Sequence, residues 1–245
     1  MIPKKIHYCW FGGKPLPKLA KKCINSWKKY CPDFEIIRWD ESNFDLNICP
    51  FVREAYDAKM YAFVADYARF YALYNEGGIY MDTDEEVIKP LDVFLSEKAF
   101  LGFEHEDRIQ AGIVGNEKNG QWILENLQHY IDRHFLKEDG SYDTTPIGAI
   151  ITKNLSKYGF IPNNKKQTLS CGVTLYPTDY FCPMDYKKGI FSLTKKAYTI
   201  HHYAASWLEK NKKSIFVHRL LGDNFYYSTP YYRMRNLYKK IFEKQ

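Results

Sequence analysis

The architecture of the chain is set by one run of residues, Gly77-Gly78-Ile79-Tyr80-Met81-Asp82-Thr83-Asp84-Glu85-Glu86. The glycine pair stands where a helical pattern ends, because glycine readily takes the left-handed conformation that caps a helix. The apolar residues that follow predict a short strand, 79–81, which ends directly on Asp82. Two carboxylates one residue apart can then face a single hard cation, since magnesium and manganese take oxygen ligands. The alternative is an ordinary acidic surface turn, because such pairs are common in turns.

The charge around this run favours the metal interpretation. Four acidic residues cluster here, although the chain as a whole is basic, with 35 Lys and Arg against 29 Asp and Glu and a formal net charge of +6. Like charges repel one another unless a cation offsets them. We therefore expect Mn²⁺ or Mg²⁺ to bind at Asp82 and Asp84.

Helical and strand patterns alternate on both sides of the run. The apolar spacing predicts helices at 17–30, 52–58, 61–76, 121–132 and 147–158, and strands at 2–8, 34–39, 79–81, 99–103, 113–115, 173–176 and 198–201. The opening strand, helix, strand order is typical of a sheet whose loops collect at one edge, where α/β proteins bind small ligands. The fold class is therefore α/β. A chain of 245 residues fits one large domain, which we place at 1–230, followed by a helix at 231–245.

Composition excludes several classes of protein. With 45% apolar and 26% charged residues, the chain is not mainly disordered. It has no run of eighteen apolar residues and no leader-like N-terminus, so we expect neither a membrane span nor secretion. Its six cysteines form no C-x-x-C pair, which favours free thiols in a reducing cytosol. The aromatic and basic signatures of RNA-binding sheets are missing, so we expect no nucleic-acid partner.

A second group of candidate residues lies on the predicted helix 61–76. Asp66 and Arg69 are three residues apart and share a face of this helix, which is otherwise apolar nearly all round. Charges on a buried helix need partners inside the protein. Asp66 and Arg69 are thus either a structural buried ion pair or part of a ligand site, and we favour the site.

A third group follows the last predicted strand. His201 and His202 are adjacent, and neighbouring side chains on a strand point to opposite sides, so one of them at most reaches a given site. Ser206 and Trp207 follow within six residues and offer a hydroxyl and an indole donor. An imidazole ligand with these donors suits a metal-bound diphosphate, whereas a lone histidine is more commonly a packed or exposed one.

Both ends of the chain are basic. Residues 1–31 contain eight lysines and no acidic residue, which fits either an anionic partner or a solvated helix face. The predicted helix 231–245 is amphipathic and basic, and it either packs on the domain or contacts an anionic membrane. In the second case the protein acts at the cytoplasmic face of the membrane.

Taken together, four motifs resemble the DXD-containing sugar transferases of glycosyltransferase family 32. They are the run from Ile6 to Gly13, the pair Asp66 and Arg69 with the residues between them, the run Gly77–Asp84, and His201 with Ser206 and Trp207. Bacterial members of the family are similar to capsular and surface polysaccharide enzymes, and the nucleotide half also resembles the large clostridial glucosylating toxins. The resemblance implies a GT-A fold with a mixed central sheet and flanking helices.

The resemblance also implies a function. It points to a retaining hexosyltransferase that uses a divalent cation, Mn²⁺ or Mg²⁺, and a nucleotide-diphosphate sugar, with a UDP-sugar favoured. The acceptor would be a saccharide, free or lipid-linked, in surface polysaccharide synthesis. The enzyme would be cytoplasmic, in peripheral contact with the inner face of the membrane.

Roles for individual residues follow from the same resemblance. Asp84 would ligate the metal, Asp82 would contact the donor and the water shell of the metal, and His201 would be a further ligand, although His202 is an alternative. Asp82, Asp84 and Arg69 would be the catalytic residues. Trp10 would stack on the nucleotide base, and the remaining donor-binding residues would be Tyr8, Asp66, Arg69, Asp82, Ser206 and Trp207.

Chemistry supports this mechanism in outline, because a cation stabilises the negative charge that develops on a departing diphosphate. Our hypothesis is front-face transfer, in which the leaving phosphate helps to deprotonate the acceptor. One rival is a phosphohydrolase of the Asp-x-Asp-x-Thr type, although position 86 is Glu instead of Thr. A second is a non-catalytic module that binds carbohydrate or a membrane surface.

Overall fold

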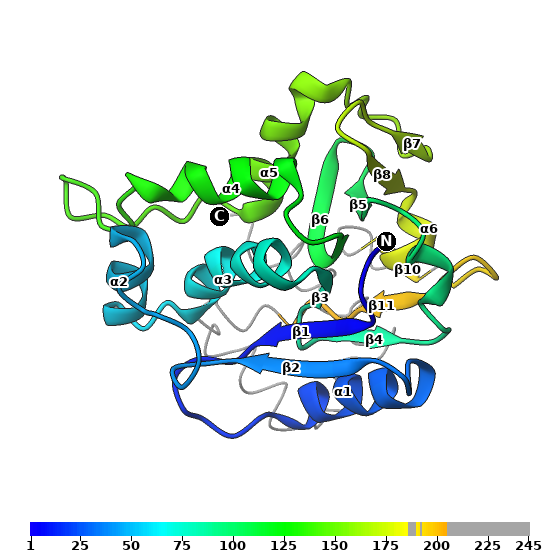
Figure 1. Cartoon of the computed structure of the whole chain (residues 1–245), viewed down its shortest axis with the longest axis horizontal. Helices are drawn as coiled ribbons and strands as arrows, with labels where there is room; N and C mark the ends of the chain where they lie inside the picture. The colour runs from blue at the N-terminus through cyan, green and yellow to red at the C-terminus, as the bar shows by residue number, and fades with distance from the viewer. Residues whose placement is uncertain (186–189, 192, 205–245) are drawn as a thin grey trace, which may run out of the picture.

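The computed structural model describes residues 1–185, 190–191 and 193–204. Within them, seven strands form one central sheet (Figure 1). In chain order these are β1 (Lys5–Cys9), β2 (Glu35–Trp39), β3 (Gly78–Met81), β5 (Ala99–His105), β6 (Arg108–Asn116), β7 (Gln167–Thr168) and β8 (Val173–Tyr176). Their order across the sheet is β2-β1-β3-β6-β5-β8-β7.

The sheet is mixed. β1 pairs in parallel with β2 and with β3, and β5 pairs in parallel with β8, whereas the other neighbouring strands are antiparallel. The helices are α1 (Lys18–Tyr30), α2 (Pro50–Asp57), α3 (Tyr61–Glu76), α4 (Gln121–Ile131), α5 (Ile147–Leu155) and α6 (Thr178–Phe181), with short 3₁₀ turns η1 (Asp92–Phe94) and η2 (Ser156–Tyr158). The predicted α/β class, a mixed central sheet with flanking helices, is confirmed.

Two smaller sheets complete the described fold. β4 (Glu85–Val87) pairs antiparallel with β11 (Thr199–His201), and β9 (Met184–Asp185) pairs with β10 (Ile190–Phe191). The first of these two sheets matters for the site, because it joins the end of β3 to a segment more than a hundred residues later. The sequence pattern did not predict β4, since its three residues include two acids.

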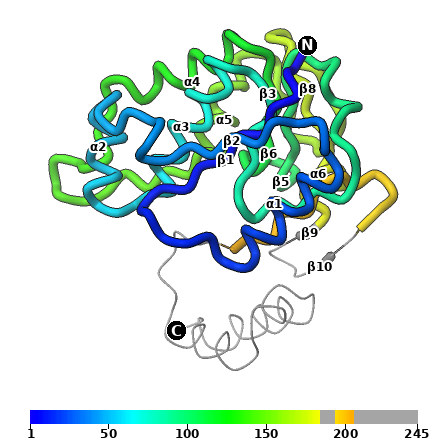
Figure 2. The backbone as a smooth tube through the Cα atoms, turned by 60° about the horizontal axis from the view of Figure 1, so that its bottom comes forward, coloured from blue at the N-terminus to red at the C-terminus, as the bar shows by residue number. Residues whose placement is uncertain are grey.

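The central sheet separates two apolar cores. Side chains alternate between the faces of a strand, so Tyr80 of β3 packs with α2, α3 and α4, while Ile79 and Met81 pack with Trp27 of α1. Figures 1 and 2 show this arrangement, with α1 on one side of β1 and β2 and with α3 and α4 on the other. Burying apolar surface on both faces stabilises the sheet, and it leaves the strand ends free to carry polar groups.

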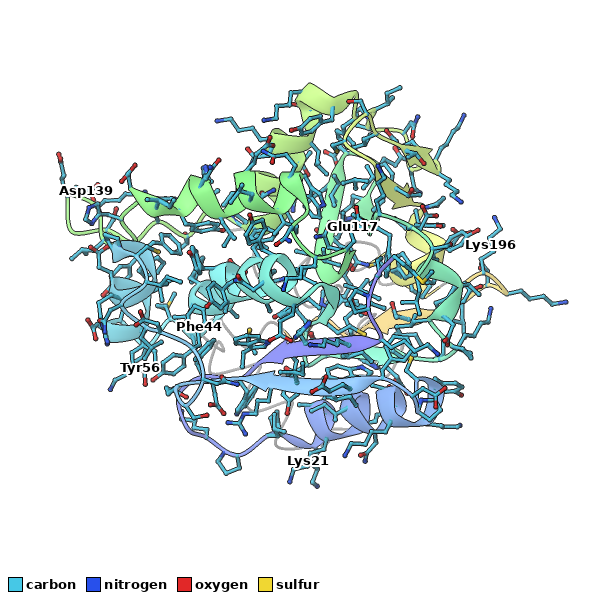
Figure 3. All side chains as sticks on the ribbon, viewed as in Figure 1. Lys21, Phe44, Tyr56, Glu117, Asp139 and Lys196 are labelled. Carbon is cyan, nitrogen blue, oxygen red and sulfur yellow. The ribbon has the colours of Figure 1, made fainter. Side chains whose placement is uncertain are left out.

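Helix α1 is amphipathic, as predicted. Its inner face buries Leu19, Ala20, Cys23, Ile24 and Trp27, and its lysines lie on the outer face. Figure 3 shows Lys21 projecting from the outer side of the helix. Helix α3 covers the predicted range 61–76 and is buried along most of its length, which the nearly continuous apolar pattern indicated.

The glycine pair ends α3 and begins β3. Gly77 has a φ of 67° and Gly78 a φ of 112°, so both take backbone conformations that side chains rarely adopt. A Cβ atom on Gly78 would also lie 2.9 Å from the Lys5 carbonyl oxygen of β1. Glycine is therefore required at this point for the chain to turn from the helix into the centre of the sheet.

Several predicted boundaries were wrong. The strand predicted at 113–115 is only the part of β6 near its carboxyl end, and β6 starts at Arg108, because Gln110 and two glycines hide its apolar alternation. The helix predicted at 147–158 ends at Leu155 and tightens into η2, which stops at Gly159 with a φ of 87°. The first strand begins at Lys5, not at residue 2. The helix predicted at 231–245 lies outside the described residues, so the division at residue 230 stays a prediction.

Two compositional expectations concern the chain as a whole. All six cysteines are free thiols, and five of them are buried. Among the described residues, the helices are too short or too polar to cross a bilayer.

Candidate functional site

The site begins at the end of β3, near the middle of the central sheet. The Asp82 amide donates a hydrogen bond to the Gly112 carbonyl of β6 at 2.8 Å, and the Glu85 amide donates to the Asp82 carbonyl at 2.9 Å. These bonds fix a tight turn from Asp82 to Glu85. The turn presents the carboxylates of Asp82 and Asp84 at the carboxyl end of β3, where the sequence placed them.

The small sheet brings His201 to this turn. β11 pairs with β4 so that His201 lies opposite Glu85, and the backbone contact continues as the His202 amide donates to the Asp84 carbonyl at 3.0 Å. The Ala204 amide then donates to Asp84 Oδ2 at 2.8 Å. The segment after β11 is thus tied directly to the second carboxylate of the Asp-x-Asp pair.

Three side chains meet at this place. Asp82, Asp84 and His201 offer ligand atoms that all lie within 4.8 Å of one another, and His201 Nε2 is 3.5 Å from Asp84 Oδ2. Two carboxylate oxygens and one imidazole nitrogen form a donor set that suits Mn²⁺ or Mg²⁺, with the remaining positions open to water or phosphate oxygens. The residues present therefore fit a divalent cation.

The electrostatics of this cluster match such a site. Burial raises the pKa of Asp84, but the charge and hydrogen bond of His201 and the Ala204 amide outweigh it, and the pKa falls to about 2. Burial lowers the pKa of His201, but Asp84 and Glu85 raise it well above its ordinary value. Without a cation, the carboxylate of Asp84 is therefore balanced by a proton on His201, and a cation would take the place of that proton.

His202 has a different partner. Its Nε2 lies 2.7 Å from Glu86 Oε2, and Lys22 Nζ of α1 donates to the same oxygen at 2.7 Å. The two adjacent histidines therefore point to opposite sides of the chain, as their position on a strand predicted. The structure brings His201, and not His202, to Asp84.

Arg69 is held rigidly beside the acidic pair. It donates to Asp66 Oδ1 at 2.8 Å and to the Ala111 carbonyl of β6 at 2.6 Å, and it lies 3.5 Å from Asp82 Oδ1. Its guanidinium stacks 4.6 Å above the ring of Tyr80, whose hydroxyl donates to Asp82 Oδ1 at 2.9 Å. A fixed positive charge therefore stands next to Asp82.

Burial shapes the charges in this network. Burial raises the pKa of Asp66 to about 7, although Arg69 opposes the shift. Burial lowers the pKa of Arg69, but Tyr80 and the carboxylates of Asp82 and Asp66 outweigh it, so the pKa is raised and the guanidinium stays charged. Asp66 and Arg69 thus form a buried ion pair, and Arg69 also contacts Asp82 in the acidic turn.

Tyr8 and Trp10 lie at and just after the carboxyl end of β1, which pairs in parallel with β3 and so ends at the same edge of the sheet as Asp82. The Tyr8 ring is buried and packs edge-on against Trp27, with centroids 5.7 Å apart. Trp10 is half-buried, its indole N–H donates to the Lys14 carbonyl at 2.6 Å, and Arg38 Nη2 lies 3.4 Å from its carbonyl. Trp10 therefore retains exposed surface that a ligand could contact, whereas Tyr8 is buried. Ser206 and Trp207 lie outside the described residues.

Two residues near the site received no role from the sequence. Tyr80 joins Arg69 to Asp82, and strict alternation along 79–82 was a signal that Tyr80 and Asp82 share a face. Glu85 is fully buried, and burial raises its pKa to about 8. No local pattern marked it, because its surroundings come from β6 and β11.

Comparison with known proteins finds relatives among the glycosyltransferases. Residues 17–101 match the family model described as a glycosyltransferase sugar-binding region containing a DXD motif. Among curated proteins, the chain is similar to inositol phosphoceramide mannosyltransferase 3 of Schizosaccharomyces pombe, with 31% identity over 157 residues, which cover 60% of this chain and 43% of that protein. It is also similar to inositol phosphoceramide mannosyltransferase 1 of the same yeast, with 32% identity over 111 residues, 41% of this chain and 33% of that protein. The chain thus spans less than half the length of these relatives.

Among solved structures, the chain is similar to one titled PaToxG glycosyltransferase, with 17% identity, a TM-score of 0.46, and coverage of 64% of this chain and 68% of that one. This overlay is partial, and the similarity to sugar transferases rests on the sequence match and on the acidic pair within the matched region. Residues 17–101 therefore resemble the sugar-binding region of DXD-containing glycosyltransferases, and the mixed sheet with flanking helices agrees with the GT-A fold that the resemblance to glycosyltransferase family 32 implies.

Proposed function

We propose that this chain is a metal-dependent glycosyltransferase that moves a sugar from a nucleotide-diphosphate sugar to a saccharide or lipid-linked acceptor in surface polysaccharide synthesis. One observation carries the proposal. Asp82, Asp84 and His201, from two separate segments, place their ligand atoms within 4.8 Å of one another at the carboxyl end of a central strand. The match of residues 17–101 to a glycosyltransferase sugar-binding region supports the same activity.

The residues of the site have distinct tasks in this proposal. Asp82, Asp84 and His201 hold Mn²⁺ or Mg²⁺, which when bound supplies positive charge that stabilises the leaving diphosphate. Arg69 is anchored by Asp66 and by the Ala111 carbonyl, so it adds a second positive charge without having to reorganise during the reaction. Trp10, Ser206 and Trp207 are proposed to bind the nucleotide and the distal phosphate.

The sugar is best sought among hexoses. The curated relatives are named as mannosyltransferases, which favours a mannosyl donor for this chain. The sequence resemblance favoured a UDP-sugar, so both kinds of donor belong in the test. The transfer is proposed to retain the anomeric configuration by the front-face route, and the NMR spectrum of the product reports this directly. Inversion at the anomeric carbon would overturn that part of the proposal.

The expected result of a donor screen is one preferred partner. With Mn²⁺ present, we expect slow release of nucleotide from one of a set of GDP- and UDP-hexoses, and a raised melting temperature with that donor because it binds only the folded chain. EDTA should abolish both effects, and added Mn²⁺ should restore them. Cleavage of simple phosphate esters with no preference for a sugar nucleotide would instead indicate the rival phosphohydrolase, and binding of sugars without any turnover would indicate the non-catalytic module.

The location of the enzyme is also a proposal. We place it in peripheral contact with an anionic membrane, and the outer face of α1 supports this. Exposed lysines line that face at 18, 21, 22, 28 and 29, and in the described part of the chain only Lys22 has an acidic partner, Glu86. The curated relatives are named for an inositol phosphoceramide acceptor. Anionic lipid attracts such a lysine face, by about 1 kcal/mol for each lysine near the surface.

Vesicle binding tests this placement. Replacing Lys18, Lys21, Lys28 and Lys29 with Gln is expected to weaken binding to phosphatidylserine vesicles by about 100-fold or more. The matched control replaces four exposed lysines elsewhere, Lys137, Lys153, Lys165 and Lys166, so that the net charge changes equally. Equal loss in both variants would show that net charge alone matters. Unchanged binding in the α1 variant would shift the contact to residues 231–245, whose deletion completes the series.

A further inference from the structure

Glu85 is an unusual buried acid. It lies in β4 with none of its surface exposed, and neither carboxylate oxygen makes a hydrogen bond of normal geometry to another described residue. The hydroxyl of the neighbouring Thr199 is already donated to the Phe181 carbonyl at 2.9 Å. Burying a carboxyl group without a partner costs free energy. A native protein that keeps such a group there needs a reason for it.

The surrounding fold makes room for this carboxyl group. A Cβ atom on Gly112 of β6 would lie 2.5 Å from Glu85 Oε1, so glycine at 112 leaves space for that oxygen in its present position. The main chain is fixed as well, because the Trp27 indole N–H donates to the Glu85 carbonyl at 2.7 Å. The backbone of Glu85 is therefore fixed, and its carboxyl group lies against Gly112 of β6.

His201 faces this carboxyl group. The antiparallel register sets His201 directly opposite Glu85, and residues directly opposite each other on paired strands have side chains on the same face. His201 Nδ1 is buried, makes no hydrogen bond of normal geometry to another described residue, and lies 3.9 Å from Glu85 Oε1, with the Cys182 thiol also beside the ring. The other ring nitrogen, Nε2, faces Asp84 at 3.5 Å. Glu85 Oε1 and His201 Nδ1, which both lack a hydrogen bond of normal geometry, are therefore neighbours.

We infer that Glu85 is a positioning residue that holds His201 as a metal ligand. Its carboxyl oxygen accepts a hydrogen bond from His201 Nδ1–H, while Nε2 is directed at the cation shared with Asp82 and Asp84. A ligating histidine needs an acceptor for its second ring nitrogen, because that bond fixes both the tautomer and the ring orientation. The closing of the 3.9 Å gap is expected when the cation binds. The inference rests on the proposed metal-dependent function.

The bond does not depend on the charge of Glu85. An ionised carboxylate accepts the hydrogen bond, and so does the carbonyl oxygen of a protonated carboxyl group. An amide carbonyl at the same place would accept it as well. This chemistry separates Glu85→Gln, which keeps an acceptor, from Glu85→Leu, which has none.

The measurement is Mn²⁺ affinity of the full chain by titration calorimetry, without donor or acceptor. We expect Glu85→Leu to bind Mn²⁺ about 10- to 100-fold more weakly than the wild type, and Glu85→Gln to stay within a few-fold of it. Glu86→Leu is the matched control, since Glu86 lies next in β4 but contacts His202 and Lys22 instead. Cys182→Ala is a second control, because the Cys182 thiol also lies beside His201.

The outcomes separate the inference from the function on which it rests. If the wild type binds Mn²⁺, His201→Ala weakens it, and Glu85→Leu does not, the inference is overturned and the function stands. Equal losses in Glu85→Leu and Glu86→Leu, or a loss in Cys182→Ala alone, would also overturn it. If the wild type binds no Mn²⁺, both fall.

A measurement on the unaltered protein covers the case in which Glu85→Leu does not fold. Nitrogen-15 NMR of the histidine rings in the Mg²⁺-loaded protein should show His201 protonated at Nδ1, with slow exchange of that proton. A ring protonated at Nε2, or bound to the metal through Nδ1, would contradict the assignment.

Discussion

Replacing Asp84 with Asn is expected to lower the rate of sugar transfer by about 1000-fold, which is the scale of removing one strong electrostatic contribution to a transition state. The carboxylate is buried, its pKa lies near 2, and it faces both His201 and the other carboxylate of the pair. Asparagine keeps an oxygen that accepts the Ala204 amide, so the turn is retained while the charge is lost. The measurement is the rate of transfer at saturating donor and Mn²⁺.

A control separates the site from general effects of charge. Asp33 is an exposed acid whose ion pair in the described part of the chain is with Lys4, away from the acidic turn, so Asp33→Asn should keep the wild-type rate. The Mn²⁺ affinity of Asp84→Asn should fall together with its rate. Full metal-dependent activity in this variant would remove Asp84 from the site and with it the basis of the proposed mechanism.

The second large effect concerns stability. Asp66→Leu is expected to lower the free energy of unfolding by about 3 to 5 kcal/mol, because it leaves the buried guanidinium of Arg69 without its closest carboxylate partner. The side chains of Asp66 and Arg69 are only 11% and 5% exposed, and their atoms are 2.8 Å apart. Asp82, at 3.5 Å, compensates only in part. Urea denaturation without metal measures the loss.

The double variant shows whether the two side chains act as a pair. Asp66→Leu combined with Arg69→Met removes both charges and puts apolar side chains in their place, and such replacements are tolerated far better than a broken pair. The double variant should therefore be more stable than Asp66→Leu alone. Additive losses from the two single changes would show that each residue is stabilised by other neighbours and not by its partner.

Much of the fold was predictable because its signals are local. The buried length of α3 follows from a nearly unbroken apolar pattern, and its end follows from Gly77. The inner face of α1 follows from the three- and four-residue spacing that ends at Trp27. The glycines in β6 broke the alternation on which a strand prediction depends, so the strand was longer than predicted.

The same distinction between local and long-range signals applies to the residues of the site. Asp82 and Asp84 lie at the end of β3, and Asp66 and Arg69 lie three residues apart on one helix. The sequence alone identified these two pairs, because periodicity fixes which near neighbours share a face. It could not choose between His201 and His202 or find the environment of Glu85. Those depend on the register of β11 on β4, which joins segments more than a hundred residues apart. A shift of one residue in that register would exchange the two histidines, and packing of the whole chain, not any local pattern, fixes the register.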